Sequence, residues 1–168
     1  MTEVARETES EAAAFHDLGG LEGLLSFYIR SINIAVSRDL DNKLSGLDVA
    51  KGTGKISTLL IVSRHPGIRP SAIADLIMRD RSSMGRLVDK MVQQGLVMRQ
   101  SDPEDQRSQA LYLTGKGQKL AQNVVALTQQ QDREFFHMVS EDEKALMLNL
   151  FNKIMCWHRQ QRSDIRFI

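Results

Sequence analysis

The sequence predicts a mainly α-helical fold with one small β-ribbon, and three patterns support this. Two short amphipathic helices, at residues 70–77 and 81–94, are separated by a polar break. Two strand-like runs follow, at 96–99 and 110–113, with a charged turn between them. Longer helical patterns lie toward both ends of the chain. Helix, turn, helix and ribbon, in that order, make up a winged helix-turn-helix, a fold used mostly to grip duplex DNA.

Composition narrows the class of protein. The chain has 168 residues, of which 42% are hydrophobic and 26% charged, as is typical of a soluble globular protein. No apolar run approaches the ~20 residues of a membrane span, and the acidic start lacks the basic and apolar segments of a secretory signal. The single cysteine, Cys156, excludes an intrachain disulfide and suits a reducing compartment. We therefore expect a cytoplasmic protein.

The net charge of +1 conceals an uneven distribution. Residues 1–50 hold 4 basic and 9 acidic side chains, a net of −5, whereas residues 64–119 hold 10 basic and 6 acidic ones, a net of +4. The basic excess therefore coincides with the predicted helix-turn-helix and ribbon, where DNA phosphates would be met. The alternative is ordinary scatter of charge among segments, so the distribution supports DNA binding without establishing it.

The chain begins with a tail and a long helix. Residues 1–14 are acidic and have no periodic apolar face, which indicates a frayed tail. From Leu18, apolar residues recur at three- and four-residue steps and predict a helix. Its apolar surface is wider than one contact needs, as is typical of helices wrapped by a partner subunit. A polar stripe also follows this helix, either as a solvated strip or as part of a ligand pocket, and consists of Ser26, Arg30, Asn33 and Ser37.

A second helix precedes the helix-turn-helix. Asp48 is its predicted N-cap, and residues 65–67 mark its end. The stretch 51–55 does not fit a phosphate-binding loop, because the required glycine and hydroxyl positions hold Val49 and Ile56. The sequence also lacks metal-ligand spacing and a nucleophile elbow. We therefore predict a protein that is not an enzyme and that holds no cofactor or metal.

The first helix of the helix-turn-helix has clear start and stop signals. Pro70 suits the first helical position, where its missing N–H costs nothing. Residues 78–80 form the turn, and Asp80 is the predicted N-cap of the next helix. Ala74 is small where the two helices must approach closely. The predicted buried face consists of Ile73, Ala74 and Ile77.

The helix from Arg81 to Gln94 has the features of a recognition helix. Its buried face follows helical spacing, and Gly95 ends it in a left-handed cap. The outward surface of its N-terminal half is small or basic. A helix inserted into a major groove needs little bulk, donors for base edges and cationic groups for phosphate. The predicted buried residues are Met84, Leu87, Val88 and Met91.

Three ordered motifs carry a family resemblance: Gln94-Gly-Leu-Val-Met-Arg99, Asp102-Pro-Glu-Asp-Gln-Arg107 and Leu111-Tyr-Leu-Thr-Gly-Lys-Gly117. Together with residues 65–67 and the helix pair, they are similar to the signature of the MarR (multiple antibiotic resistance regulator) family. The resemblance covers roughly residues 18–165. It implies a homodimer whose terminal helices interlock and whose two winged helices straddle a pseudo-palindromic DNA operator.

The resemblance also implies roles for particular residues. Arg107 corresponds to the wing-tip arginine that enters the minor groove and recognises its shape. Asp105 would fix the wing by a charge-assisted bond; alternatively, both residues only stabilise a tight turn. Arg69 stands where the family commonly has a capping Thr or Ser, which puts this cap in doubt, and Arg69 could contact a phosphate instead. The expected contacts on the recognition helix are Arg81, Ser82, Ser83, Arg86 and Lys90.

Two further helices are predicted after the ribbon. Thr114 is the expected N-cap of a long helix whose apolar positions are Leu120, Val124, Leu127, Phe135 and Met138. Residues 140–143 match a capping box and start the last helix. We expect Cys156 to be a buried, inert thiol there. The other side chains that this helix is expected to bury are Leu146, Leu150, Ile154 and Trp157.

The predicted organisation is a tail (1–14), an N-terminal dimerisation helix (15–47), a winged helix-turn-helix (48–117) and C-terminal dimerisation helices (118–168). The resemblance implies a repressor that a small effector, often a phenolic or aromatic acid in this family, releases from DNA. The effector would bind between the dimerisation helices and the winged helix, and the candidate pocket residues are Arg30, Asn33 and His65. Two alternatives stay open: a thiol-redox regulator acting through Cys156, and a winged helix that contacts only proteins.

Overall fold

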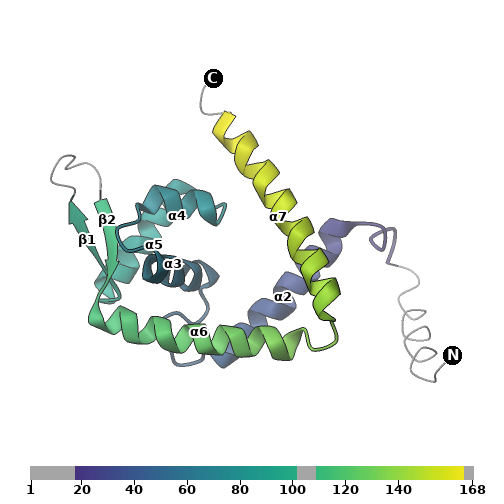
Figure 1. Cartoon of the computed structure of the whole chain (residues 1–168), viewed down its shortest axis with the longest axis horizontal. Helices are drawn as coiled ribbons and strands as arrows, with labels where there is room; N and C mark the ends of the chain where they lie inside the picture. The colour runs from purple at the N-terminus through teal and green to yellow at the C-terminus, as the bar shows by residue number, and fades with distance from the viewer. Residues whose placement is uncertain (1–17, 102–108, 165–168) are drawn as a thin grey trace. The chain divides into compact units, whose positions relative to one another are not determined.

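The computed structural model describes residues 18–101 and 109–164 (Figure 1). By its internal contacts the chain divides into two units, Met1–Arg38 and Asp39–Ile168. The first unit contributes most of one helix, and the second holds the remaining helices and the ribbon. None of the described helices is long and apolar enough to cross a membrane.

The first described helix, α2 (Leu25–Lys43), starts later than the apolar pattern predicts. Gly19 and Gly20 have φ angles of +64° and +87°, in the left-handed region that glycine adopts most readily. The backbone before Leu25 therefore forms turns, and the predicted start at Leu18 is wrong. No side chain of α2 is buried, and Leu25 is 76% exposed.

The second helix, α3 (Thr53–Arg64), also starts later than predicted. Residues 47–51 form turns, and the helix follows Gly52 without any side-chain cap. The prediction that Asp48 caps α3 is therefore wrong. Its carboxylate instead lies 2.7 Å from Lys116 Nζ, on a helix that follows the ribbon.

The helix-turn-helix is confirmed, with α4 at Pro70–Leu76 and α5 at Arg81–Gln93. Pro70 occupies the first turn of α4, and Asp80 caps α5 by accepting a hydrogen bond from the Ser83 N–H. The two helices pack directly on each other, with Ala74 fully buried, as its small size predicts.

The ribbon is confirmed and is slightly longer than predicted. Strands β1 (Val97–Ser101) and β2 (Gln109–Leu113) pair antiparallel, with the first residue of β1 opposite the last of β2. Gly95, at φ +66°, turns the chain from α5 into β1, as its predicted left-handed cap requires. Ile68 forms an isolated bridge to Leu111, which fastens the segment before α4 to the ribbon.

Helix α6 (Gly115–Phe135) starts directly against the ribbon. Its predicted cap is confirmed: the Gly117 N–H donates to Thr114 Oγ1 at 3.1 Å. A Cβ added to Gly117 would lie well inside 3.0 Å of the Leu96 carbonyl oxygen, a distance that real Cβ atoms essentially never show. Only a glycine therefore allows this approach. The prediction that Met138 belongs to the apolar face is wrong, because the helix ends before it and the side chain is 66% exposed.

One hydrophobic core joins α3, α4, α5, the ribbon and α6 (Figure 1). Its only described buried hydroxyl, Thr58, donates to Met84 Sδ at 3.9 Å, so a polar group in this core still has a partner. The buried apolar side chains are Leu44, Val49, Ile56, Leu59, Val62, Ile73, Ala74, Met84, Val88, Met91, Leu96, Val97, Leu111, Leu113, Ala121 and Val124.

The last helix, α7 (Glu141–Asp164), begins with the predicted capping box. The Ser140 N–H donates to Glu143 Oε2 at 2.9 Å, and the Glu143 N–H donates to Ser140 Oγ at 3.4 Å. The bonds that Ser140 donates hold the pKa of the Glu143 carboxyl below its usual value. Local sequence alone therefore places the start of α7 correctly.

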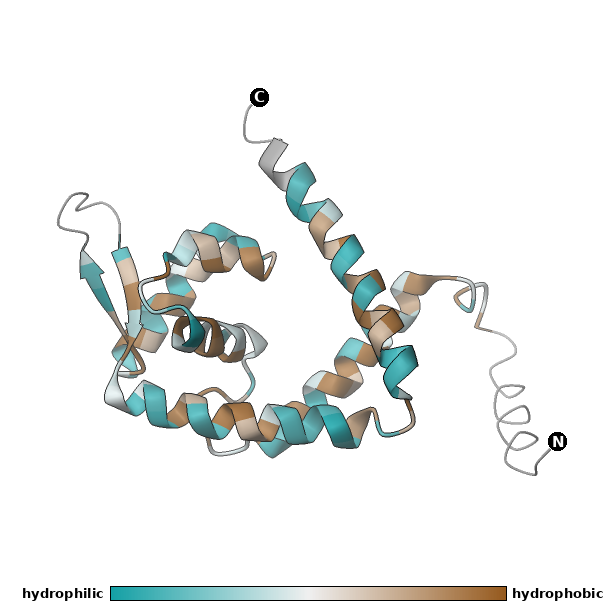
Figure 2. Ribbon diagram, in the orientation of Figure 1, coloured by the Kyte–Doolittle hydropathy of each residue, from teal (hydrophilic) through white to brown (hydrophobic). Residues whose placement is uncertain are grey.

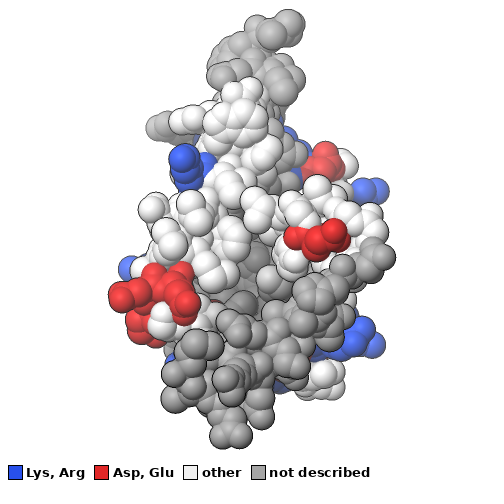
Figure 3. All heavy atoms as spheres, turned by 90° about the vertical axis from the view of Figure 1, so that its right-hand side faces the viewer, with Lys and Arg blue, Asp and Glu red and all other residues white. Residues whose placement is uncertain are grey.

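The predicted burial of the apolar side chains of α7 is wrong for the single chain. Figure 2 shows hydrophobic residues distributed along the helix, yet its exposed side chains include Leu146 at 59%, Leu150 at 48%, Ile154 at 46% and Trp157 at 56%. Cys156 is also exposed. On the face of the molecule in Figure 3, charged side chains form a few separate groups with uncharged ones between them. Within the described part of the second unit, these side chains of α7 are left exposed.

Candidate nucleic-acid interface

The N-terminal end of α5 is held by a tight network around Asp80. The Ser82 hydroxyl and the Ser83 N–H both donate to Asp80 Oδ1, at 2.6 Å and 2.9 Å. These bonds, with that from the Ser82 hydroxyl as the largest cause, lower the pKa of the Asp80 carboxyl to about 2. The cap is therefore ionised at neutral pH. Because the Ser82 hydroxyl donates to Asp80, its oxygen is left to accept from a base or a water.

The outward face of α5 presents cationic groups at intervals of about one turn. Arg81 is exposed and lies 3.5 Å from the Asp75 carboxylate on α4. Arg86 is exposed, and its Nη2 donates to Ser83 Oγ at 3.4 Å. Lys90 is exposed as well, and among the described residues it has no ion-pair partner. The structure thus places all five predicted contacts of the recognition helix on α5, with Ser83 half-buried and the others exposed.

Gly85 leaves the middle of this face of α5 without a side chain. A Cβ added there would meet no atom within 4 Å, so nothing in the fold itself requires a glycine. A bare backbone at this position allows close approach to a partner surface. That observation agrees with the prediction of a helix that enters a groove.

An ion pair that the sequence did not suggest braces the ribbon against α5. Arg99 Nη2 of β1 lies 2.7 Å from Asp89 Oδ1 of α5. The two residues lie on either side of the Gly95 turn. The sequence feature that could have predicted the ion pair is therefore a pair of opposite charges ten positions apart across a turn. The brace fixes the ribbon relative to the recognition helix, a relation that two-part DNA contact requires.

The remaining predicted DNA contacts have mixed outcomes. Arg69 is exposed at the N-cap position of α4 and makes no side-chain capping bond, in line with the doubt about this cap. Asp105 and Arg107 lie in the segment 102–108, outside the described residues. Their roles stay predictions, although β1 and β2 end directly at this segment.

The predicted ligand-pocket residues are exposed but belong to separate units. Arg30 and Asn33 lie on α2 in the first unit. His65 follows α3 in the second unit, where its N–H donates to Ile61 O at 2.8 Å. Their role in an effector pocket therefore stays a prediction.

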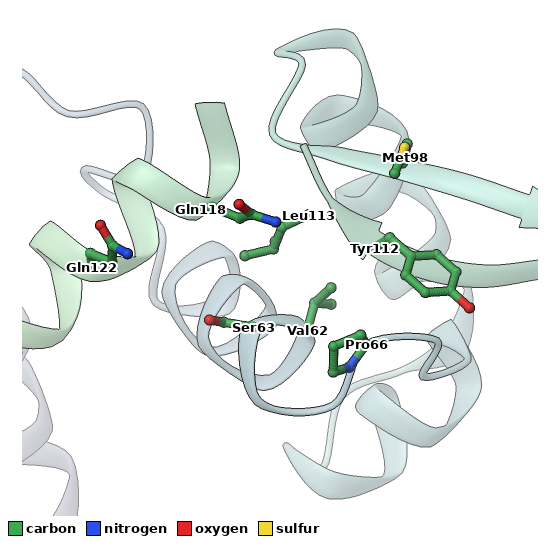
Figure 4. A pocket seen from close by; sticks show the side chains of 8 residues that line it. All are labelled: Val62, Ser63, Pro66, Met98, Tyr112, Leu113, Gln118 and Gln122. Carbon is green, nitrogen blue, oxygen red and sulfur yellow. The ribbon is translucent and has the colours of Figure 1, made fainter. Parts of the chain in front are cut away.

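Two hollows in the second unit differ in chemistry. One, of about 390 Å³, lies between α3, the ribbon and α6, and Figure 4 shows its lining side chains. Met98 and Tyr112 line it together with uncharged residues only, so it offers no cation for an acid. The other, of about 230 Å³, flanks α5 and is lined by Arg79, Ser83, Arg86, Leu87 and Lys90. Arg79 is not indicated by any sequence pattern, because it lies in the turn before α5 and on no periodic face.

Comparisons with known proteins agree with this geometry. Residues 54–109 match the model of the MarR family. A protein of Thauera aromatica, named as a transcriptional regulatory protein for the hcr operon, is 24% identical over 148 residues, covering 88% of this chain and 89% of that protein. The structure of the transcriptional repressor CouR bound to a 23-mer DNA duplex superposes with a TM-score of 0.74 at 22% identity, covering 82% of this chain and 96% of that one.

A third comparison concerns a structure with a bound ligand. The PcaV transcriptional regulator of Streptomyces coelicolor, in complex with its natural ligand, superposes with a TM-score of 0.73 at 20% identity and covers 82% of this chain and 96% of that one. At these identities the two structures establish the fold, and the family match covers the segment from the start of α3 to the ribbon. The chain therefore carries a winged-helix domain that matches the MarR family over residues 54–109, and the similar proteins named above are transcriptional regulators.

Proposed function

We propose that the protein is a homodimeric repressor that binds a pseudo-palindromic DNA operator and is released by a small aromatic or phenolic acid. The observation that carries DNA binding is the outward face of α5. There, a capped and braced helix turns small side chains and three cationic ones outward. Cationic groups contact phosphates and fix the register of the protein, while hydroxyls and arginine can bond to base edges in the major groove.

The exposed apolar side chains of α7 support the homodimer. Six large ones on this helix are 42–59% exposed: Leu146, Leu148, Leu150, Phe151, Ile154 and Trp157. Completing the burial of a half-exposed side chain of this size gains roughly 1 kcal/mol. Leu146, Leu150, Ile154 and Trp157 lie on one side of the helix, so two copies of that side contribute about 8 kcal/mol, which is comparable to the roughly 4–15 kcal/mol cost of association. The apolar face of α2 adds to this total. In a dimer of this kind the two recognition helices would meet half-sites one DNA turn, ~34–36 Å, apart.

The proposed effector is a small aromatic or phenolic acid. A carboxylate needs a cation, and Arg30 on α2 is exposed and available for such a pair. Asn33 and His65 are the other candidates. The structurally similar PcaV regulator is described in complex with its natural ligand, which supports a ligand-responsive function for this chain. An effector that favours one spacing of the two recognition helices would shift the affinity for the operator.

Selection of duplexes from a random DNA pool, followed by fluorescence anisotropy on the selected duplex, tests DNA binding. We expect a steep fall in affinity with salt, because bound phosphates release counterions. Arg86→Gln should weaken binding by about 1–3 kcal/mol, whereas Arg133→Gln, an equal charge change on α6, should not. If no duplex is selected, and if any residual association with DNA does not depend on salt, the result would support a winged helix that contacts only proteins.

Sedimentation velocity tests the dimer. Leu150→Lys places a charge on the exposed apolar face of α7 and should shift the protein toward monomer. The neighbouring Asn149→Lys, at an exposed polar position of the same helix, is the matched control. If both variants sediment as the wild type does, α7 is not the interface.

The exposure of Cys156 favours one second candidate, a thiol-redox regulator. Oxidation of an accessible thiol would change the α7 surface and hence the dimer. Peroxide titration with operator affinity as the readout separates the two functions. An affinity that peroxide leaves unchanged in both the wild type and Cys156→Ser excludes the redox function.

A further inference from the structure

The side chain of Arg79 lies between two hollows in the second unit. Its backbone is fixed in the turn between α4 and α5, where the Arg79 N–H donates to Ala74 O at 2.8 Å. On one side it lines the hollow that flanks α5, together with Ser83, Arg86 and Lys90. On the other side it lines a hollow of about 310 Å³ whose opposite wall is the first turn and a half of α3. One guanidinium thus joins α3 to the candidate DNA-binding face of α5.

Gly54 provides the seat for this guanidinium. A Cβ added to Gly54 would lie well inside 3.0 Å of Arg79 Nη1, and it would also come within 3.3 Å of Leu87 Cδ2. Gly54 has an ordinary helical backbone, so its φ angle does not explain the glycine. The absence of a side chain serves the packing of Arg79 against α3.

The charge of Arg79 is not neutralised within the described residues. No described carboxylate lies within ion-pair distance of it, and its Nε is shielded from solvent without a hydrogen-bond partner. A shielded guanidinium N–H without an acceptor costs free energy, so an acceptor supplied from outside would be bound favourably. The hydroxyls of Thr53 and Ser57, one helical turn apart on α3, line the same hollow and can donate to the same acceptor.

We propose that this hollow binds a phosphate of the DNA backbone, with Arg79, Thr53 and Ser57 as the contacts. The ligand class follows from the donors, since one cation and two hydroxyls suit an oxyanion. Duplex DNA is the source because Arg79 also borders Arg86 and Lys90, so the hollow continues the cationic face of α5. The proposal rests on the DNA-binding function above and extends the interface from α5 to α3.

Three variants test the site by fluorescence anisotropy on the selected duplex over a range of salt concentrations. Arg79→Gln removes the cation and should raise Kd about tenfold, lowering the magnitude of the log–log salt slope by about 0.9 for the lost phosphate contact. Gly54→Ala keeps every charge but displaces Arg79 from its seat, so it should raise Kd in the same direction. Alanine favours a helix over glycine, so α3 remains formed in this variant, which thermal melting verifies. Arg133→Gln on α6 is the control and should leave both quantities unchanged.

The outcomes separate this site from the proposed function. If the wild type binds DNA with a steep salt slope but Arg79→Gln has the same Kd and slope, the phosphate site is refuted and DNA binding stands. If Arg79→Gln weakens DNA binding but Gly54→Ala does not, the charge of Arg79 attracts DNA at long range and its position against Gly54 does not matter. The phosphate site is then also refuted. Inorganic phosphate, titrated at constant ionic strength, tests a free anion. A rise in Tm that requires Arg79, with DNA affinity independent of Arg79, would assign the hollow to free phosphate and overturn the DNA assignment.

Discussion

Gly117→Ala is the single-atom change to which the fold should be most sensitive. Gly117 lies in the first turn of α6, where the helix rests on the backbone that enters β1. The new methyl group would lie well inside 3.0 Å of Leu96 O, at 3.0 Å from Leu96 C and at 3.4 Å from Leu96 Cα. All three are backbone atoms, which cannot rotate away as a flexible side chain could. Helix α6 must therefore move off the ribbon.

The expected loss of stability follows from what this movement disturbs. Overpacking a close contact costs about 1–3 kcal/mol. The same shift lengthens the bonds by which Thr114 N and Oγ1 reach Leu96 O and Gly95 O, now 2.5–3.3 Å, and each is worth about 1 kcal/mol. Alanine in a helix recovers about 0.5–1 kcal/mol. The free energy of unfolding should fall by about 3 kcal/mol.

Urea denaturation of the wild type and two alanine variants, at one fixed protein concentration, measures this loss. A fixed concentration matters because a dimer makes the midpoint concentration-dependent. Gly85→Ala is the matched control: its Cβ meets no atom within 4 Å, so it should raise stability by about 0.5–1 kcal/mol. We therefore expect glycine-to-alanine substitution to lower the free energy of unfolding at position 117 and to raise it at position 85. A Gly117→Ala midpoint within error of the wild type would show that α6 does not rest on Leu96.

Three smaller effects should also be measurable. The pKa of the Asp80 carboxyl is lowered to about 2, so the stability that its ionised form contributes is present above pH ~4 and is lost as the pH falls through ~2. The urea midpoint of the wild type should therefore decline over this pH window more than the midpoint of Asp80→Asn. Asp89→Asn removes an exposed ion pair with Arg99 and should lower the free energy of unfolding by only about 0.5 kcal/mol, again by urea titration. A thiol reagent should label Cys156 rapidly at dilution and more slowly as protein concentration rises, whereas concentration-independent labelling would argue that α7 stays uncovered.

Sequence predicted the elements whose signals are local. Asp80 and Thr114 cap α5 and α6 as expected, because a cap depends only on the next three residues. Gly95 takes the left-handed conformation that ends a helix. The ribbon and the buried face of α5 followed from periods of two and 3.6 residues. The recognition-helix residues were placed on one surface for the same reason.

Relations across the fold were not predictable in this way. Asp48 has the right chemistry for a cap, but turns separate it from α3 and its carboxylate pairs with Lys116 instead. The seat of Arg79 on Gly54 joins residues 25 positions apart and belongs to no motif. The ion pair of Arg99 with Asp89 depends on the Gly95 turn that brings β1 back beside α5. Each of these contacts is set by the packed core, which a one-dimensional pattern does not contain.

The error at α7 has a different origin and is itself informative. Leu146, Leu150 and Ile154 recur every four residues, as do the buried Met84 and Val88 of α5, so periodicity treats both faces alike. Folding separates them: the α5 pair is at most 1% exposed, whereas the three α7 side chains are 46–59% exposed. An apolar face that remains exposed after the chain has folded requires a cover from elsewhere. A second copy of α7 offers the same apolar face, which supports the proposed homodimer over an unrelated partner.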